Sequence, residues 1–308
     1  MKQKTQFKGV IMLLLTAFIW GSAFVAQDIG MENVESFTFG GIRTLLGALV
    51  LLPVVIIRDK KSTLSAEQRR ADNKKTLKYG VILGLVFCLA TNFQQYAFVF
   101  PESSPGKIAF ITAMYMFFVP LLGLAFMRKK VSSITWICVL CGFVGLYFLC
   151  ITQGDMTAVS MSDILSFICA LFFAVHILLV EKFSPEADGV KLSFIQFAVS
   201  GIITTMLMFI FEDPHISQIK NAALPIFYSG ILSCGVAYTF QIIGQKYTEA
   251  TIASIIMCTE SVFAVLCSAL ILRDIPAERE IIGCVIMFAA ILLSELSDTI
   301  TSKLSKKH

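Results

Sequence analysis

The stretch ESFTFGGIRTLLGALVLLP, residues 35–53, is apolar along almost its whole length, yet Arg43 lies well inside it. An apolar helix of about 20 residues crosses the ~30 Å hydrocarbon core of a membrane, so this stretch predicts a membrane-spanning helix. At 1.5 Å rise per residue, Arg43 would lie roughly 10 Å from the polar end of that helix. A charge at such a depth is costly, and it normally faces a cavity or a partner.

The whole chain has the composition of a membrane protein. Of its 308 residues, 56% are hydrophobic and 15% are charged, whereas about a quarter of the residues of a soluble domain are charged. Ten apolar runs are long enough to span a membrane as helices: 8–28, 36–57, 78–99, 106–127, 131–151, 162–180, 191–211, 222–244, 250–272 and 280–297. The sequence therefore predicts an all-α polytopic membrane protein with ten transmembrane helices. We expect the first run to be a span and not a cleaved signal peptide, because it has no small-residue cleavage site.

The charges between the runs predict the orientation of the helices. Lys and Arg number 20 on the side of the two termini and 4 on the other side, and Arg43 completes the total of 25. By the positive-inside rule we expect both termini in the cytoplasm and the protein in the cell membrane. The basic segment RDKKSTLSAEQRRADNKKTLK, residues 58–78, is interpreted as a flexible cytoplasmic loop that touches anionic lipid headgroups, and no nucleic acid is expected as a partner.

Two constant offsets relate the second half of the chain to the first. An offset of 153 pairs Trp20 with Phe173, Asp28 with Glu181 and Arg43 with Gln196. An offset of 144 pairs Ile108–Ala109 with Ile252–Ala253 and Met116 with Glu260. We therefore expect two repeats, residues 1–151 and 152–308, with five helices each. An odd number of helices per repeat gives the repeats opposite orientations in the membrane, an architecture that suits alternating access around a site near the midplane.

Short motifs in these helices carry a family resemblance. WGSAF (20–24), GIRTLL (41–46) and TESVFAVL (259–266), together with the ten runs, resemble the EamA branch of the drug/metabolite transporter superfamily. The resemblance implies a 5+5 inverted-repeat carrier that exports amino acids or other small metabolites through a central cavity. Two features depart from the family pattern. Glu260-Ser261 replaces a frequent Glu-Pro, so a helix break there is not expected, and Lys129-Lys130 replaces a common acidic residue, for which Asp274 stands in the second half.

Arg43 and Glu260 are the two charges that lie deepest in the runs. Two roles stay open for Arg43. It either orients the helices or offers a positive charge near a cavity mouth, or else it reaches the headgroups or anchors to a backbone carbonyl. We interpret Glu260 as a proton- or cation-coupling site or as the partner of a substrate amine, since desolvation favours the neutral form of a carboxyl group.

Polar and aromatic residues near these charges predict a substrate site. In the first helix, Trp20, Phe24 and Gln27 fall on one face, because they are spaced i, i+4 and i+7. The other candidates are Asn92, Gln95 and Tyr96 in the third helix, with Gln94 pointing elsewhere, His176 in the sixth, and Tyr238 and Gln241, followed by Gln245, in the eighth. A few hydrogen-bonding groups among apolar walls are typical of a small-molecule site. Each residue taken singly could instead pack or join two helices.

These patterns predict a secondary-active transporter that exports a small metabolite such as an amino acid. No ATP-binding motif occurs, so a gradient would supply the energy. A polytopic membrane enzyme acting on a lipid or lipid-linked substrate is the alternative, but only three His are present to form a catalytic cluster. A channel is a third possibility, but a channel would more naturally show a ring of repeated charges than the single Glu260. No catalytic residue, cofactor or metal site is expected. The nine cysteines are interpreted as packing residues. Gly142 and Gly145 allow close helix contact, within the chain or in a possible homodimer, and membrane lipids are expected partners.

Overall fold

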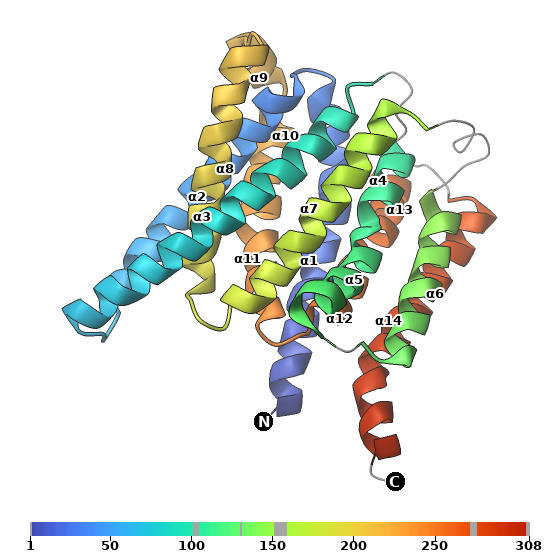
Figure 1. The fold of residues 1–308 in the computed structure, drawn as a ribbon. Helices are drawn as coiled ribbons and strands as arrows, with labels where there is room; N and C mark the ends of the chain where they lie inside the picture. Colours follow the sequence, from blue (N-terminus) through green and yellow to red (C-terminus); the bar gives the residue numbers. More distant parts are fainter. Residues whose placement is uncertain (1, 101–104, 130, 151–158, 272–275, 306–308) are drawn as a thin grey trace.

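Helices form all of the regular structure in the parts of the chain that the structure describes. In this computed structural model those parts are residues 2–100, 105–129, 131–150, 159–271 and 276–305. The helices are α1 (Lys2–Met31), α2 (Ser36–Lys60), α3 (Ala66–Ala97), α4 (Pro105–Ala113), α5 (Tyr115–Met127), α6 (Ser133–Cys150), α7 (Met161–Phe183), α8 (Gly189–Phe211), α9 (Ile216–Asn221), α10 (Ala223–Tyr228), the π-helix η1 (Ser229–Tyr238), α11 (Thr239–Gln245), α12 (Ala250–Met257), α13 (Glu260–Ile271) and α14 (Glu278–Ser305). Figure 1 shows them as a bundle in which α1 begins and α14 ends at the same end, called the terminal end below.

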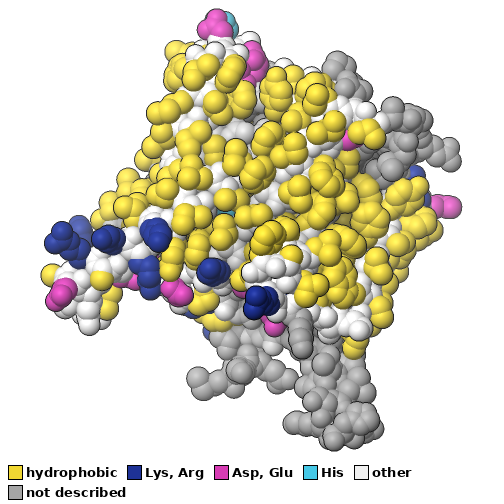
Figure 2. Space-filling view, in the orientation of Figure 1, with side chains coloured by type: hydrophobic (Ala, Val, Ile, Leu, Met, Phe, Trp, Pro, Cys, Tyr) yellow, Lys and Arg dark blue, Asp and Glu magenta, His cyan; other side chains and the backbone are white. Residues whose placement is uncertain are grey.

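Eight helical segments of the described chain are long and apolar enough to cross a membrane. They are Gln6–Met31, Ser36–Lys60, Ala66–Ala97, Ile108–Met127, Met161–Phe183, Gly189–Phe211, Ala223–Gln245 and Ala250–Cys267, and Ser133–Leu149 is a shorter apolar helix. Hydrophobic side chains cover the middle of the molecular face in Figure 2, while Lys and Arg gather towards its lower edge. The chain is thus a multi-pass membrane protein. None of the eight cysteines whose side chains the structure describes forms a disulfide bond with another of them.

The basic segment 58–78 is mostly helical, so the predicted loop is wrong. Helix α2 continues to Lys60 and α3 already begins at Ala66. A capping box starts α3, because the Gln68 amide donates to Ser65 Oγ (3.2 Å) and the Ser65 amide donates to Gln68 Oε1 (3.1 Å). The residues that follow, rich in Arg, Lys, Glu and Ala, favour a helix even when they face water.

Two of the membrane-crossing segments are broken at equivalent places. One break separates α4 from α5 at Met114, and the other separates α12 from α13 at Cys258–Thr259. The Phe117 amide donates to Met114 O (2.8 Å) and the Ser261 amide donates to Cys258 O (3.3 Å), two bonds that the offset of 144 superposes. The expectation of an unbroken helix at Glu260-Ser261 is therefore wrong, because a tight three-residue turn breaks the helix there without proline.

The two breaks also meet in space. Cys258 Sγ lies 3.6 Å from the carbonyl oxygen of Ala113, the last residue of α4. Helix α5 packs against α12 beside this contact, and most of α12 is fully buried. The middle of the bundle is therefore built from four half-length helices whose ends converge, and such ends leave backbone groups free to face a cavity.

Helices α6 and α14 pack against each other beside the rest of the bundle (Figure 1). Their contact depends on glycine, since a Cβ at Gly145 would lie 3.0 Å from Gly283 O and 2.9 Å from Met287 Cγ. The predicted close approach at Gly145 thus occurs within the chain. Small residues at such crossings let two helix backbones pack by van der Waals contact.

Gly145→Leu is expected to lower the stability of the protein by about 1–3 kcal/mol, because the new side chain would push α6 away from α14. Gly123→Leu is the matched control, since a Cβ at Gly123 meets only Leu178 Cδ2, at an ordinary 3.6 Å. Thermal unfolding in one detergent measures both. Equal losses for the two variants would show that the Gly145 contact contributes nothing special.

Candidate functional site

A central cavity lies where the two helix breaks meet. Its volume is about 40 Å³, enough for a few water molecules, since one water needs roughly 10–15 Å³ measured in this way. Seven of the eleven residues that the sequence predicted for the site line it: Trp20, Phe24, Gln27, Arg43, Tyr238, Gln241 and Glu260. Pockets that hold small organic molecules measure roughly 300–1,000 Å³, so a metabolite would require the surrounding helices to separate.

Arg43 is buried at the cavity with amide side chains as its hydrogen-bond partners. Its Nη1 donates to Gln27 Oε1 (2.7 Å), its Nη2 lies 3.4 Å from Gln95 Oε1, and its guanidinium lies over the Phe39 ring. The residue is 6% exposed, so it does not reach towards the headgroups, and that alternative is wrong. In the described chain no carboxylate pairs with Arg43 and its Nε has no partner. The guanidinium can therefore bind an anionic group of a ligand.

Glu260 is the first residue of α13 and lies directly after the second helix break. The residue is 8% exposed, and its carboxyl group accepts a hydrogen bond from the Tyr115 hydroxyl (3.4 Å) at the start of α5. No Lys or Arg of the described residues forms an ion pair with it. The position at a helix N-terminus favours a carboxylate, while burial favours the neutral acid. Glu260 is the one acidic residue among the described residues that line the cavity.

Aromatic rings form one wall of the cavity. Trp20 and Tyr238 pack with ring centroids 4.5 Å apart, and Phe87 meets Tyr238 edge-on at 4.8 Å. Tyr238 is the last residue of the π-helix η1, and π-helical turns occur often at functional sites. Two polar atoms of this wall, Trp20 Nε1 and Gln241 Oε1, have no hydrogen-bond partner in the described chain. A ligand could supply an acceptor to the first and a donor to the second.

The remaining predicted residues lie outside the cavity. Asn92 donates to Cys88 O and Thr204 Oγ1, both at 2.8 Å. His176 lies 3.0 Å from Gln196 Oε1, and both are fully buried. The Gln95 side chain accepts from Arg43 Nη2 (3.4 Å), and its carbonyl oxygen accepts from Ser36 Oγ (3.3 Å). Tyr96 is 43% exposed and stacks on Phe37. Asn92 and His176 therefore join helices, the alternative that the sequence left open for such residues.

Several cavity residues were missed in the sequence. Gln94 lines the cavity and donates to Thr112 Oγ1 (3.4 Å), so the expectation that Gln94 points elsewhere is wrong. Tyr115, Phe173 and Ser233 line the cavity as well. The repeat contained a signal for two of these, since Phe173 is the equivalent of Trp20, and Tyr115 adjoins Met116, the equivalent of Glu260. Within the described residues, no three His, Cys, Asp or Glu side chains gather to hold a metal ion.

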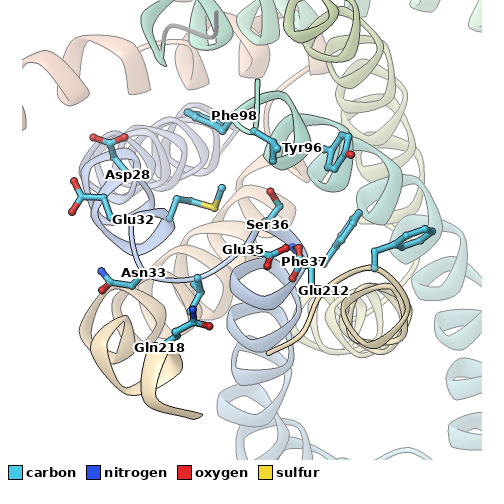
Figure 3. Close-up of a pocket in the computed structure, with 14 residues that line it drawn as sticks. Asp28, Glu32, Asn33, Glu35, Ser36, Phe37, Tyr96, Phe98, Glu212 and Gln218 are labelled. Carbon is cyan, nitrogen blue, oxygen red and sulfur yellow. The ribbon is translucent and has the colours of Figure 1, made fainter. Parts of the chain in front are cut away.

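A second, larger pocket of about 990 Å³ (Figure 3) lies where α1 passes into α2, at the end of the bundle opposite the terminal end (Figure 1). Asp28, Glu32, Glu35 and Glu212 line it, with Phe37 and Tyr96 on one side. Glu212 caps α2, because its carboxylate accepts from the amides of Phe37 and Thr38, both at 2.6 Å. None of the residues that line this pocket lines the central cavity.

Known proteins match both halves of this chain. The EamA-like transporter family matches residues 7–151 and again residues 160–296. An uncharacterized transporter of Archaeoglobus fulgidus is 26% identical over 92% of the chain and 84% of its own length, and the uncharacterized transporter YoaV of Bacillus subtilis is 22% identical over 93% and 96%. The uncharacterized inner membrane transporter YicL of Salmonella typhimurium is 22% identical over 94% of the chain and 95% of its own length. A crystal structure superposes with a TM-score of 0.75 at 14% identity, covering 94% of this chain and 96% of the other, so the fold is shared.

Proposed function

This chain belongs to the EamA-like transporter family, and from that premise we propose that it is a secondary-active transporter of the cell membrane that exports a small metabolite. The observation that carries the proposal is the central cavity, where one buried carboxyl group and one buried guanidinium face a space between two broken helices. Alternating access opens such a space to one side of the membrane at a time. The family and its relatives are transporters, which disfavours the membrane enzyme as the alternative.

The proposed architecture has ten membrane-spanning helices in two inverted repeats. Helices α6 and α14 would complete the eight apolar spans, residues 1–151 and 152–308 would form the repeats, and both termini would be cytoplasmic. The equivalent breaks after Ala113 and Met257 support the repeat, because the offset of 144 superposes them. In this orientation the terminal end is the cytoplasmic end, in agreement with the Lys and Arg side chains near it in Figure 2.

Glu260 is the proposed coupling site. A proton on Glu260 removes a buried charge where the two breaks meet, and its release restores that charge, so the two states of the carboxyl group favour different arrangements of the half-helices. Tyr115 joins the first break to this carboxyl group. Protonation at one side of the membrane and release at the other would couple substrate movement to a proton gradient.

The proposed substrate is a zwitterion such as an amino acid. Arg43 would bind the carboxylate, because it lacks an anionic partner, and Glu260 with Gln241 Oε1 would accept hydrogen bonds from the ammonium group. Trp20 Nε1 offers a further donor to the carboxylate. A ligand with both charges satisfies every unpartnered group of this wall at once, whereas a simple anion or cation would leave one charge of the site unmatched.

A thermal-shift panel tests the substrate class. The detergent-purified protein is heated with amino acids, nucleosides, nucleobases, sugar phosphates and cationic drugs, and amino acids are expected to raise its unfolding temperature. A ligand at ~100 times its Kd stabilises the folded state by about 2.7 kcal/mol. Stabilisation by sugar phosphates alone, with none by amino acids, would contradict the proposed zwitterion.

A further inference from the structure

One carboxylate joins three elements at the terminal end of the bundle. Glu181, near the end of α7, forms an ion pair with Lys129 and accepts a hydrogen bond from the Ala250 amide (3.3 Å), the first residue of α12. The Glu181 side chain is 15% exposed. The Lys129 side chain is 41% exposed, so the ion pair by itself contributes little. The carboxylate is mostly withdrawn from water, and its bond to the amide at the N-terminus of α12 adds to its contribution.

The chain holds Lys129 in place for this contact. Arg128 ends α5 with a left-handed backbone (φ 53°), and the Lys129 amide donates to Gly123 O (3.1 Å). Arg128 is the only residue other than glycine in the described chain with a positive φ. The turn stops α5 and sends Lys129 towards α7. Glu181 therefore connects the end of α5 to the beginning of α12 through its two oxygens.

Helices α5 and α12 are also joined at their other ends, beside the cavity. Tyr115 at the start of α5 donates to Glu260, and Cys258 after α12 contacts Ala113. Between these two attachments, Met116 and Val119 of α5 and Ile256 of α12 are fully buried. In this conformation the two half-helices are thus joined at both ends, and Glu181 forms the attachment nearer the terminal end.

The repeat places a second carboxylate at the opposite end. The offset of 153 pairs Glu181 with Asp28, and the offset of 144 pairs Ala250 with Gly106 at the start of α4. Asp28 is exposed and lines the large pocket, where Figure 3 shows it beside Glu32. No hydrogen bond or ion pair joins Asp28 to another described residue. Of the two equivalent carboxylates, Glu181 thus has partners, and Asp28 has none among the described residues.

We propose that Glu181 is a positioning residue that latches the terminal end shut by capping α12, and that Asp28 caps the start of α4 in the opposite conformation. The two carboxylates would be engaged in turn. The role of these two caps in transport rests on the proposed function. The change from one cap to the other is a property of the protein alone, so it can be measured without substrate.

Hydrogen exchange in lipid nanodiscs, without substrate, tests this inference. Glu181→Ala is expected to speed amide exchange in residues 250–256 roughly tenfold, as the loss of a charged hydrogen bond implies, and to slow it in residues 106–112, because α4 becomes capped. The double variant Glu181→Ala/Asp28→Ala is expected to lose the slowing at α4. Glu186→Ala is the matched control, since Glu186 is an exposed carboxylate on the same side, 4.0 Å from Lys75, and should change neither segment.

Two outcomes would overturn the latch. If Glu181→Ala speeds amide exchange at α12 but leaves it unchanged or faster at α4, Glu181 is an ordinary helix cap and not a latch. If Glu181→Ala leaves exchange at α12 unchanged, Glu181 does not stabilise α12 at all. The milder variant Glu181→Gln keeps an oxygen for the Ala250 amide and should shift both segments in the same directions by less, which guards against misfolding of the Ala variant. If Glu181→Ala speeds exchange at α12 and slows it at α4, but no metabolite raises the unfolding temperature of the wild-type protein, the latch is supported and the proposed substrate is wrong.

Discussion

Glu260→Gln is expected to abolish substrate accumulation driven by a pH gradient. Gln keeps the shape of the side chain and an oxygen for the Tyr115 hydroxyl, but it cannot take up a proton. Each unit of pH gradient supplies about 1.4 kcal/mol per proton, which corresponds to about tenfold accumulation for one coupled proton. Proteoliposomes with two units of gradient should thus accumulate substrate roughly 100-fold with the wild-type protein and not at all with the Gln variant.

Tyr115→Phe is the matched control for this experiment. It removes the hydroxyl that donates to Glu260 and leaves the carboxyl group, so accumulation should fall in rate and keep its dependence on pH. Exchange of substrate across the membrane without a gradient should survive in the Gln variant at lower affinity, because exchange needs no proton and Gln keeps an oxygen that accepts from the ammonium group. Accumulation by Glu260→Gln with the pH dependence of the wild type would show that the coupling site lies elsewhere.

Arg43→Gln is expected to weaken amino-acid binding by at least 30-fold. Truncation of one partner of a buried charge pair costs roughly 2–5 kcal/mol. Arg43→Lys should restore only part of the affinity, since an ammonium group lacks the planar fork that binds a carboxylate through two bonds. Isothermal titration with an amino acid and with its decarboxylated amine measures the effect, because only the amino acid has a group for Arg43.

The amine separates binding from structural support. If Arg43 binds the carboxylate, the Gln variant should lose its preference for the amino acid over the amine while its unfolding temperature without ligand changes little. A large loss of stability with an unchanged preference would instead make Arg43 a bundle-orienting residue that acts through Gln27 and Gln95. Both alternatives were open from the sequence, and the comparison of amino acid with amine distinguishes them.

The parts of the site on α1 and α11 could be predicted from spacing. Trp20, Phe24 and Gln27 lie on one face of a regular helix, and the structure brings all three to the cavity. The depth of Arg43 and Glu260 was likewise visible, because a charge inside an apolar run has few alternatives. Helical periodicity and the depth of a charge in an apolar run therefore identified these five residues from the sequence.

The third helix shows where this reasoning failed. Polar residues crowd 92–96, so the spacing alone cannot say which of them faces inward, and the structure selects Gln94 over Gln95 and Tyr96. Asn92 binds Thr204, a residue 112 positions away, which no local pattern reveals. The helix break at Cys258–Thr259 was missed for a similar reason. It forms without proline against Ala113 of another helix, so tertiary contact and not local sequence decides it.

Counterflow in proteoliposomes tests the central proposal most directly. Vesicles that contain the purified protein are loaded with an unlabelled amino acid and diluted into a trace of the same labelled compound, without any ion gradient. A carrier that alternates around the cavity of Arg43 and Glu260 is expected to take up label transiently above its outside concentration. Arg43→Gln should abolish this uptake, and Glu260→Gln should retain it. Folded wild-type protein that shows no counterflow with any amino acid would contradict the proposed zwitterion carrier.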